Sequence, residues 1–240
     1  MSPTAIPGNL LLKNGMVITG SEKNPVDLYR SNVSLLLHGD GANGSTTIVD
    51  SSPSPKVVNP VGNVQIRTGV ADPFGNSTRG VIELDGTGDS LTAPISVSSF
   101  GTGNFTIELW IYKNDNVTCG IQEARPGGAV PWLWYFNGSK LEFYTGSPFQ
   151  STNNVPTGQW VHIAVTRASG VLRQFINGNK ESENIVTANL TTAGSSTLLM
   201  RTIDANSDKF SGYIDEYRVT AGIARYTSNF TPPTAPFPDI

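Results

Sequence analysis

The sequence contains one cysteine and few charged residues. A lone cysteine, Cys119, excludes an internal disulfide, and we expect a partly buried thiol without a catalytic role. Charged residues make up 15% of the chain, against about 25% in an average soluble domain. At a net charge of −3, the chain lacks the clustered Lys and Arg that bind nucleic acid or anionic lipid. Neither is therefore expected as a partner.

Long apolar runs and helical periodicity are also absent. The apolar run NLLLKNGMVI, residues 9–18, is interrupted by Lys13 and Asn14, which predicts neither a signal peptide nor a membrane-spanning segment. We therefore expect synthesis in a cytoplasm. Apolar residues do not recur at the spacing of a helix face, so little α-helix is expected.

What the sequence does contain is a series of short strand-like segments separated by turn residues, among them 25 glycines and 16 prolines. In residues 104–114 and 159–167, apolar side chains recur at every second position, as in half-buried strands. Two runs break at Asn-Gly, residues 137–138 and 177–178, and each dipeptide predicts a tight hairpin because both residues tolerate positive φ. Strands without covering helices predict two antiparallel sheets packed face to face.

The two ends of the chain differ from this pattern. Residues 1–30 carry scattered polar residues and prolines, and we predict an extended arm outside a sandwich that occupies residues 31–233. The tail, residues 234–240, is rich in proline, which cannot donate a hydrogen bond to a neighbouring strand. Ends of this composition usually fray, so we expect a neighbouring chain in an assembly to hold both of them.

Six segments carry a resemblance to a known family. In chain order they are LLLHGDG (35–41), GVIELDGTGDSLTAP (80–94), FGTGNFTIELWIY (100–112), GQWVHIAVTR (158–167), QFINGNK (174–180) and GYIDEYRVTAGIARYTSNFTPP (212–233). Together they resemble the laminin-G-like jelly roll of the concanavalin A-like lectin/glucanase superfamily. The closing ARYTSNFTPP is most similar to versions in bacteriophage structural proteins. The resemblance implies an all-β fold, a two-sheet antiparallel jelly-roll sandwich with an extended N-terminal arm.

The segment GYIDEYRV has charged residues in the middle of a strand-like run. We expect this strand to return beside the first strand, near residue 35, and to close the sheet at its edge. The residues expected on one of its faces are Tyr213, Asp215, Tyr217 and Val219. The aromatic residues Tyr226 and Phe230 are then expected to pack back on the sheet, before the double proline ends the pairing.

Catalysis is not expected. Lectins, glycan-binding modules, glycosidases and structural domains share this fold, so function depends on sites. A retaining glycosidase needs two carboxyl groups about 5–5.5 Å apart. The nearest match to its acidic motif begins at Glu83 and Asp85, but its third position is Gly88, and Asp85 is expected to bond turn amides instead. The two histidines, His38 and His162, lie in no nucleophile motif.

The resemblance implies a structural calcium ion that ties the first strand to the last, with Asp40 and Asp215 as its ligands. Calcium takes six to eight oxygen ligands, so backbone carbonyls and water would have to complete the shell. The alternative is that Asp215 and Glu216 bond neighbouring amides or pair with Arg218.

Aromatic residues suggest a second kind of site, because exposed rings pack against the CH faces of sugars. The segment PWLWYF places Trp132 and Trp134 on one face of a strand, and Tyr144 lies across the following hairpin; these three are our predicted glycan-binding residues. The alternative is that the rings fill the core between the sheets. Trp110 and Trp160 are expected to pack on a sheet.

These observations lead to two hypotheses of function. The first is a non-enzymatic phage virion protein, a capsid decoration or head-fibre component on the virion surface, which docks on other virion proteins through residues 1–30 in a homo- or hetero-oligomeric assembly. The second is a glycan-binding adhesion module of a tail fibre or receptor-binding component, which recognises host surface polysaccharide.

Overall fold

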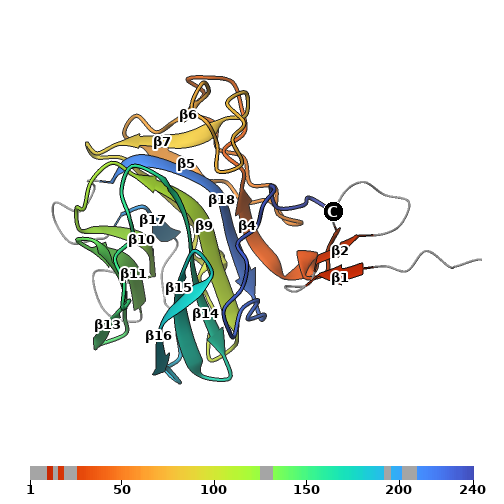
Figure 1. The fold of residues 1–240 in the computed structure, drawn as a ribbon, viewed down its shortest axis with the longest axis vertical. Helices are drawn as coiled ribbons and strands as arrows, with labels where there is room; N and C mark the ends of the chain where they lie inside the picture. Colours follow the sequence, from red (N-terminus) through yellow and green to blue (C-terminus); the bar gives the residue numbers. More distant parts are fainter. Residues whose placement is uncertain (1–9, 13–15, 19–25, 125–131, 192–195, 202–209) are drawn as a thin grey trace, which may run out of the picture.

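The chain folds into two antiparallel β-sheets packed face to face (Figure 1), which confirms the predicted all-β jelly-roll sandwich. The computed structural model describes residues 10–12, 16–18, 26–124, 132–191, 196–201 and 210–240. Within these residues, helical structure is limited to two 3₁₀ turns, η1 (Arg30–Asn32) and η2 (Ile95–Val97). None of the described helices is long and apolar enough to cross a membrane.

The larger sheet has eight strands in the described part of the chain. Its order is β16-β15-β14-β9-β18-β7-β6, and β4 also pairs with β18. The strands are β4 (Val33–Leu37), β6 (Gln65–Arg67), β7 (Val81–Asp85), β9 (Phe105–Lys113), β14 (Trp160–Ala168), β15 (Val171–Ile176), β16 (Asn179–Ile185) and β18 (Ser211–Ala221).

The smaller sheet has seven described strands in the order β13-β12-β11-β10-β17-β8-β5. They are β5 (Asn59–Val61), β8 (Ser90–Pro94), β10 (Cys119–Ala124), β11 (Trp132–Asn137), β12 (Lys140–Tyr144), β13 (Pro148–Gln150) and β17 (Ser196–Leu199). The turn after β7 therefore carries the chain from one sheet to the other, since β7 and β8 lie in different sheets.

The core lies between the two sheets and is built from alternate residues of each strand. In β9, the inward residues are fully buried: Phe105, Ile107, Leu109 and Ile111. The smaller sheet contributes large rings, and Trp132 stacks on Phe143 with ring centroids 5.7 Å apart and an interplanar angle of 6°. Burial of this apolar surface is the main force that holds the sheets together.

Both predicted hairpins are confirmed. In β15–β16, Ile176 pairs with Asn179, and the two loop residues, Asn177 and Gly178, have φ of 47° and 75°, as a type I′ turn requires. In β11–β12, Asn137 pairs with Lys140, so the loop is shifted by one residue. Its first residue, Gly138, has φ of 61°, which is typical of a type II′ turn.

Strand β18 does return beside β4, with Tyr217 opposite Leu37, as predicted. It is not an edge strand, however, because β9 and β7 flank it. A bulge between Asp215 and Arg218, with φ of 52° at Glu216, inserts an extra residue and shifts the alternation of side chains. The prediction of one shared face is therefore wrong. Tyr213 and Asp215 lie on the outer face, whereas Tyr217 and Val219 are buried in the core.

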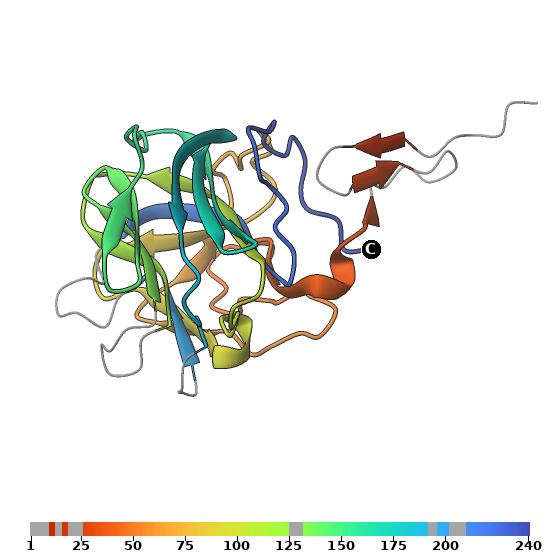
Figure 2. The ribbon, with the colours of Figure 1, turned by 90° about the horizontal axis from the view of Figure 1, so that it is seen from below.

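The N-terminal segment forms a small sheet of three short strands, β1 (Leu10–Leu12), β2 (Met16–Ile18) and β3 (Val26–Asp27). Strands β1 and β2 project from the jelly roll (Figure 2). Residues 1–9, 13–15 and 19–25 of the predicted arm lie outside the described residues. Asp27 is buried in the body of the protein, so the part of the chain fixed to the jelly roll begins before residue 30.

The C-terminal segment is held by contacts within the chain. Phe237 is buried against Val33 and Leu36 of β4. At the end of the chain, the carbonyl of Ile240 accepts a hydrogen bond of 3.0 Å from the amide of Asp27. The chain itself therefore supplies contacts that hold this end, and an additional contact with a neighbouring chain stays a prediction.

The predicted packing of the two aromatic residues after β18 is confirmed. The rings of Tyr226 and Phe230 stack with centroids 3.6 Å apart. Both rings contact Phe175 of β15. The outer face of the larger sheet is therefore covered over β14 and β15 by the C-terminal segment.

Candidate functional site

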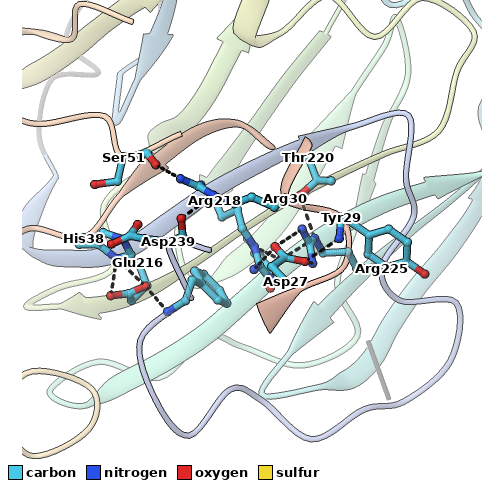
Figure 3. Close-up of polar contacts among 12 residues, drawn as sticks. Asp27, Tyr29, Arg30, His38, Ser51, Glu216, Arg218, Thr220, Arg225 and Asp239 are labelled. Carbon is cyan, nitrogen blue, oxygen red and sulfur yellow. Dashed lines mark hydrogen bonds and ion pairs between the residues drawn. The ribbon is translucent and has the colours of Figure 1, made fainter. Parts of the chain in front are cut away.

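A network of buried charges lies under the C-terminal segment (Figure 3). Arg218 donates to Glu108 at 2.7 Å and to Asp27 at 3.2 Å. Arg225 holds the same Asp27 with two hydrogen bonds of 2.9 and 2.7 Å. The hydroxyl of Tyr226 donates to Glu108 at 2.6 Å. The network joins the N-terminal strand β3, the central strands and the C-terminal segment.

The electrostatics of this network indicate a structural role. Burial alone would raise the pKa of Glu108, but the charge of Arg218 and the contact with His162 lower it well below its usual range. Glu108 therefore stays ionised at neutral pH although it is 0% exposed. His162 is also fully buried. A carboxylate enclosed in this way has no access to a substrate.

A second cluster surrounds His38, at the end of β4 (Figure 3). Its Nδ1 lies 2.9 Å from Glu216, and its Nε2 lies 3.0 Å from Asp239. Glu216 also accepts hydrogen bonds from Arg79, at 3.0 Å, and from the amide of Phe237, at 2.7 Å. The predicted alternative partner of Glu216, Arg218, belongs instead to the first network.

This cluster makes stability depend on pH. Burial lowers the pKa of His38, but Glu216 and Asp239 more than offset it and raise the pKa to about 9. Because the pKa of His38 is higher in the folded protein than in the unfolded chain, where it is about 6.5, His38 contributes fully to the free energy of unfolding below pH 6.5. This contribution is lost as pH rises to about 9. Burial and the charge of Glu216 raise the pKa of Asp215 to about 9, which acts in the same direction.

We therefore expect the free energy of unfolding to fall between pH 6.5 and 9, by at most about 3 kcal/mol from His38, since one pKa unit corresponds to about 1.4 kcal/mol. Urea unfolding across this range measures it. The His38→Gln variant should show a shallower slope, because only the contribution of Asp215 remains. Equal slopes in the two proteins would show that His38 does not contribute.

The predicted calcium ligands, Asp40 and Asp215, have different surroundings. The Asp40 side chain is 57% exposed and pairs with Arg79 at 3.2 Å. Asp215 is buried, and its Oδ2 has no hydrogen-bond partner in the described part of the chain. Arg79 contacts Asp40, Asp72 and Glu216 and already supplies positive charge at this place. No group of three or more His, Cys, Asp or Glu among the described residues could hold a metal. The donor set does not fit calcium as it stands.

The calcium prediction is tested by melting curves in calcium and in chelator. We expect the wild type to have the same melting temperature in calcium and in chelator. Asp215→Asn should lose no stability at neutral pH, because the raised pKa of Asp215 already keeps this side chain uncharged. Asp115→Asn, in the exposed turn after β9, is the control. A rise of several degrees in calcium that disappears only in Asp215→Asn would establish the ion.

The carboxylates considered for catalysis serve other contacts. Asp85 accepts the amide of Thr87 at 2.8 Å, which confirms its predicted role in the turn. Glu83 pairs with Arg67 at 3.2 Å and with Gln65 at 2.9 Å. Both residues lie on β7, the strand next to β6 at the edge of the larger sheet.

Two of the predicted glycan-binding residues are in the core. Trp132 and Trp134 are 0% exposed, and the indole of Trp134 donates to Gln174 at 3.1 Å. Fully buried rings offer no face to a sugar, so the structure corrects this prediction and favours the alternative. The prediction that Trp132 and Trp134 share one face of β11 is confirmed, but this face points into the core. Tyr144, at the end of β12, is partly exposed, and its role in binding stays a prediction.

A different set of aromatic rings lies on the outer face of the larger sheet. Tyr112 of β9 pairs with Trp160 of β14 on one side and with Tyr213 of β18 on the other. Paired residues of antiparallel strands share a face, and all three rings are partly exposed. The ring centroids are 5.8 Å apart in both pairs.

Polar side chains continue this row across the next two strands. Tyr213 pairs with Glu83 of β7, and Glu83 pairs with Gln65 of β6. Both polar residues are partly exposed. We name the five residues the outer-face row: Trp160, Tyr112, Tyr213, Glu83 and Gln65. Its strands lie side by side in Figure 1.

One loop borders the aromatic end of the row. The indole of Trp160 donates to the carbonyl of Ala71 at 2.8 Å, which fixes the orientation of the ring. In the same loop, Phe74 packs edge-on against Trp110, with centroids 6.0 Å apart. Of the row itself, the ring of Trp160 is thus held in place by this loop.

Sequence reasoning did not find the outer-face row. The period-two pattern of residues 104–114 puts Tyr112 on the face of the strand opposite the apolar side chains, but such a pattern does not show which residues of other strands lie beside it. Aromatic residues at the outward positions of three strands were the available signal. Strand register was needed to use it.

Comparisons with known proteins agree with this architecture. The sequence profile described as "Concanavalin A-like lectin/glucanases superfamily" matches residues 85–222, more than half of the chain. No curated protein matches the chain significantly.

Solved structures similar to this chain include domains that bind ligands. The binding domain of Paraclostridial Mosquitocidal Protein 1 has a TM-score of 0.62 and 16% identity, over 82% of this chain and 51% of that one. The ligand binding domain of botulinum neurotoxin serotype D, in complex with N-acetylneuraminic acid, has a TM-score of 0.59 and 15% identity, over 82% and 49%. The present chain spans about half the length of these toxin domains.

A third similar structure is matched by this chain over almost its whole length. Domain 4 of AbnA, an extracellular arabinanase from Geobacillus stearothermophilus, was solved in complex with arabinotriose. It has a TM-score of 0.58 and 20% identity, over 80% of this chain and 95% of that one. None of these three structures is a phage protein, and at such identities the likeness shows the fold. With the profile match over residues 85–222, the fold and the sequence agree: the chain belongs to the concanavalin A-like lectin/glucanase superfamily.

Proposed function

We propose that this protein is a non-catalytic carbohydrate-binding module whose sugar site is the outer-face row. The observation that carries the proposal is the row itself, in which three partly exposed aromatic rings adjoin a carboxylate and an amide on one sheet face. The lectin-like fold supports it, as do similar structures solved with arabinotriose and with N-acetylneuraminic acid.

The chemistry of the row suits a sugar. Aromatic rings offer an apolar face with little conformational entropy to lose, and the CH face of a sugar packs on such a surface. Glu83 accepts hydrogen bonds, while Gln65 both donates and accepts them, so the two match sugar hydroxyl groups. Glu83 is the one carboxylate in the row, so the row lacks the pair of carboxyl groups that a retaining glycosidase needs.

A glycan array tests the proposal. We expect the wild type to bind at least one glycan, and Tyr112→Ala to bind at least tenfold more weakly, a loss of about 1.4 kcal/mol, because Tyr112 lies between the other two rings. The fold should persist, since the ring is on the outer face.

The matched comparison is Tyr144→Ala, on the smaller sheet. If Tyr144→Ala lost binding and Tyr112→Ala did not, the sugar site would lie on the other sheet. If the wild type bound no glycan on the array, the proposed function would be wrong.

We also propose that the module is carried on a virion surface, as a capsid decoration, head-fibre or tail-fibre component. The resemblance of ARYTSNFTPP to phage structural proteins supports this, and so do the wholly apolar sequences of β1 and β2, which project from the jelly roll (Figure 2).

Deleting residues 2–25 keeps Asp27 and its ion pairs. The shortened protein should fold but no longer join phage particles during infection; normal incorporation would contradict an assembly role for the arm.

A further inference from the structure

The outer-face row has a direction. Its five residues come from five adjacent strands, each paired with the next. The row therefore runs perpendicular to the strands. Strands are about 4.8 Å apart, so four intervals span roughly 19 Å. A sugar unit in an extended glycan is close to one strand spacing in length. The row thus matches an internal stretch of chain of about four or five sugars and exceeds a single terminal sugar.

The aromatic rings of the row do not form a flat platform. The rings of Tyr112 and Trp160 are inclined by 72°, and those of Tyr112 and Tyr213 by 60°. A flat crystalline face of a polysaccharide therefore cannot lie squarely on Tyr112 and on either neighbouring ring at the same time. A single chain can rotate about each glycosidic bond and present successive sugars to differently inclined rings.

The charges along the row disfavour an acidic ligand. Glu83 is compensated by Arg67, at 3.2 Å. The exposed carboxylate of Asp85 lies two residues further along β7, and hydrogen bonds from Asn63 and Thr87 lower its pKa, so it stays ionised. With Glu83 compensated, the charge of Asp85, which has no ion pair among the described residues, disfavours an anionic glycan at this end of the row at low ionic strength.

We infer that the outer-face row binds an internal stretch of a single, uncharged glycan chain laid across the strands, with sugars stacked on Trp160, Tyr112 and Tyr213 and hydroxyl groups bonded to Glu83 and Gln65. This inference rests on the proposed function. It adds the class of ligand: soluble and neutral, without an acidic sugar and without a crystalline surface.

Affinity gel electrophoresis of the full chain at low ionic strength tests the class of ligand. The probes are soluble neutral polymers (arabinan, galactan, mannan and hydroxyethylcellulose) and acidic ones (polygalacturonate, alginate and hyaluronate). Sedimentation with microcrystalline cellulose and with chitin tests flat surfaces. We expect at least one soluble neutral polymer to retard the wild type but not Tyr112→Ala or Tyr213→Ala. The acidic and insoluble polymers should not bind.

Titration with oligosaccharides of the retarding polymer tests the length of the site. Affinity should rise with each added sugar up to about four or five units and then level off. Three outcomes would overturn the inference and leave the proposed function standing. They are binding only to acidic polymers, binding only to insoluble polymers, and equal affinity for one sugar and for long chains. Absence of binding to every probe would overturn both, and binding that survives in Tyr112→Ala and Tyr213→Ala would move the site elsewhere.

Discussion

Replacing Arg218 by alanine should lower the free energy of unfolding by about 3–5 kcal/mol, because it leaves the buried carboxylate of Glu108 without its closest cation. Arg218 is 4% exposed and contacts Glu108, Asp27 and the ring of Phe237, which lies 3.5 Å from the guanidinium. For a chain of this size, the loss corresponds to a fall in melting temperature of roughly 6–20 °C. Urea unfolding and thermal melting measure it.

The control for Arg218 is an exposed ion pair. Lys180 lies 2.9 Å from Glu183, and both side chains are about 40% exposed. Lys180→Ala should therefore cost less than about 1 kcal/mol. The double variant Arg218→Ala with Glu108→Gln should be less destabilised than the sum of the single variants, since the second change removes the uncompensated charge. Additive losses would show that the two side chains do not interact.

Replacing Trp132 by alanine should cost about 3–5 kcal/mol, the range for a large buried aromatic residue. Its ring stacks between Phe143 and the core residue Phe105. The folded fraction of Trp132→Ala should keep its glycan affinity, because the ring does not reach the surface. A loss of binding in protein that remains folded would contradict the assignment of Trp132 to the core.

Two conservative variants sharpen this prediction. The indole nitrogen of Trp132 has no hydrogen-bond partner in the described residues, whereas that of Trp134 donates to Gln174. Trp132→Phe therefore removes only ring volume, while Trp134→Phe also leaves a buried amide oxygen without its donor, which costs a further 1–3 kcal/mol or so. Trp134→Phe should be the less stable of the two by chemical denaturation. Equal stability would show that the Trp134–Gln174 bond contributes little.

The sequence by itself determined the class of fold and its local turns. Period-two alternation in residues 105–112 depends only on which side chains are apolar, so the strand and its inward face could be read directly. The two hairpins depend on the tolerance of Gly138, Asn177 and Gly178 for positive φ, which is also local. Motif order along the chain was enough to indicate the superfamily.

Tertiary structure alone decided which residues meet. The bulge at Glu216 changed the face on which Tyr217 lies, and a bulge is defined by how a strand pairs with its partner, here β9, which lies about 100 positions earlier in the chain. Phe237 and Asp239 anchor the C-terminal tail. Their partners lie about 200 positions earlier in the chain, so no local sequence pattern indicates these contacts.

The candidate site shows the same division. Tyr112 is visible in the sequence as an outward aromatic residue, yet Trp160 and Tyr213 become its neighbours only through the register of β14, β9 and β18. Conversely, Trp132 and Trp134 share a strand face in the sequence, and only the packing of one sheet on the other shows that this face is buried. Local preferences are encoded within a few residues, whereas register and burial are set by contacts between distant strands, and a surface for ligand binding depends on the latter.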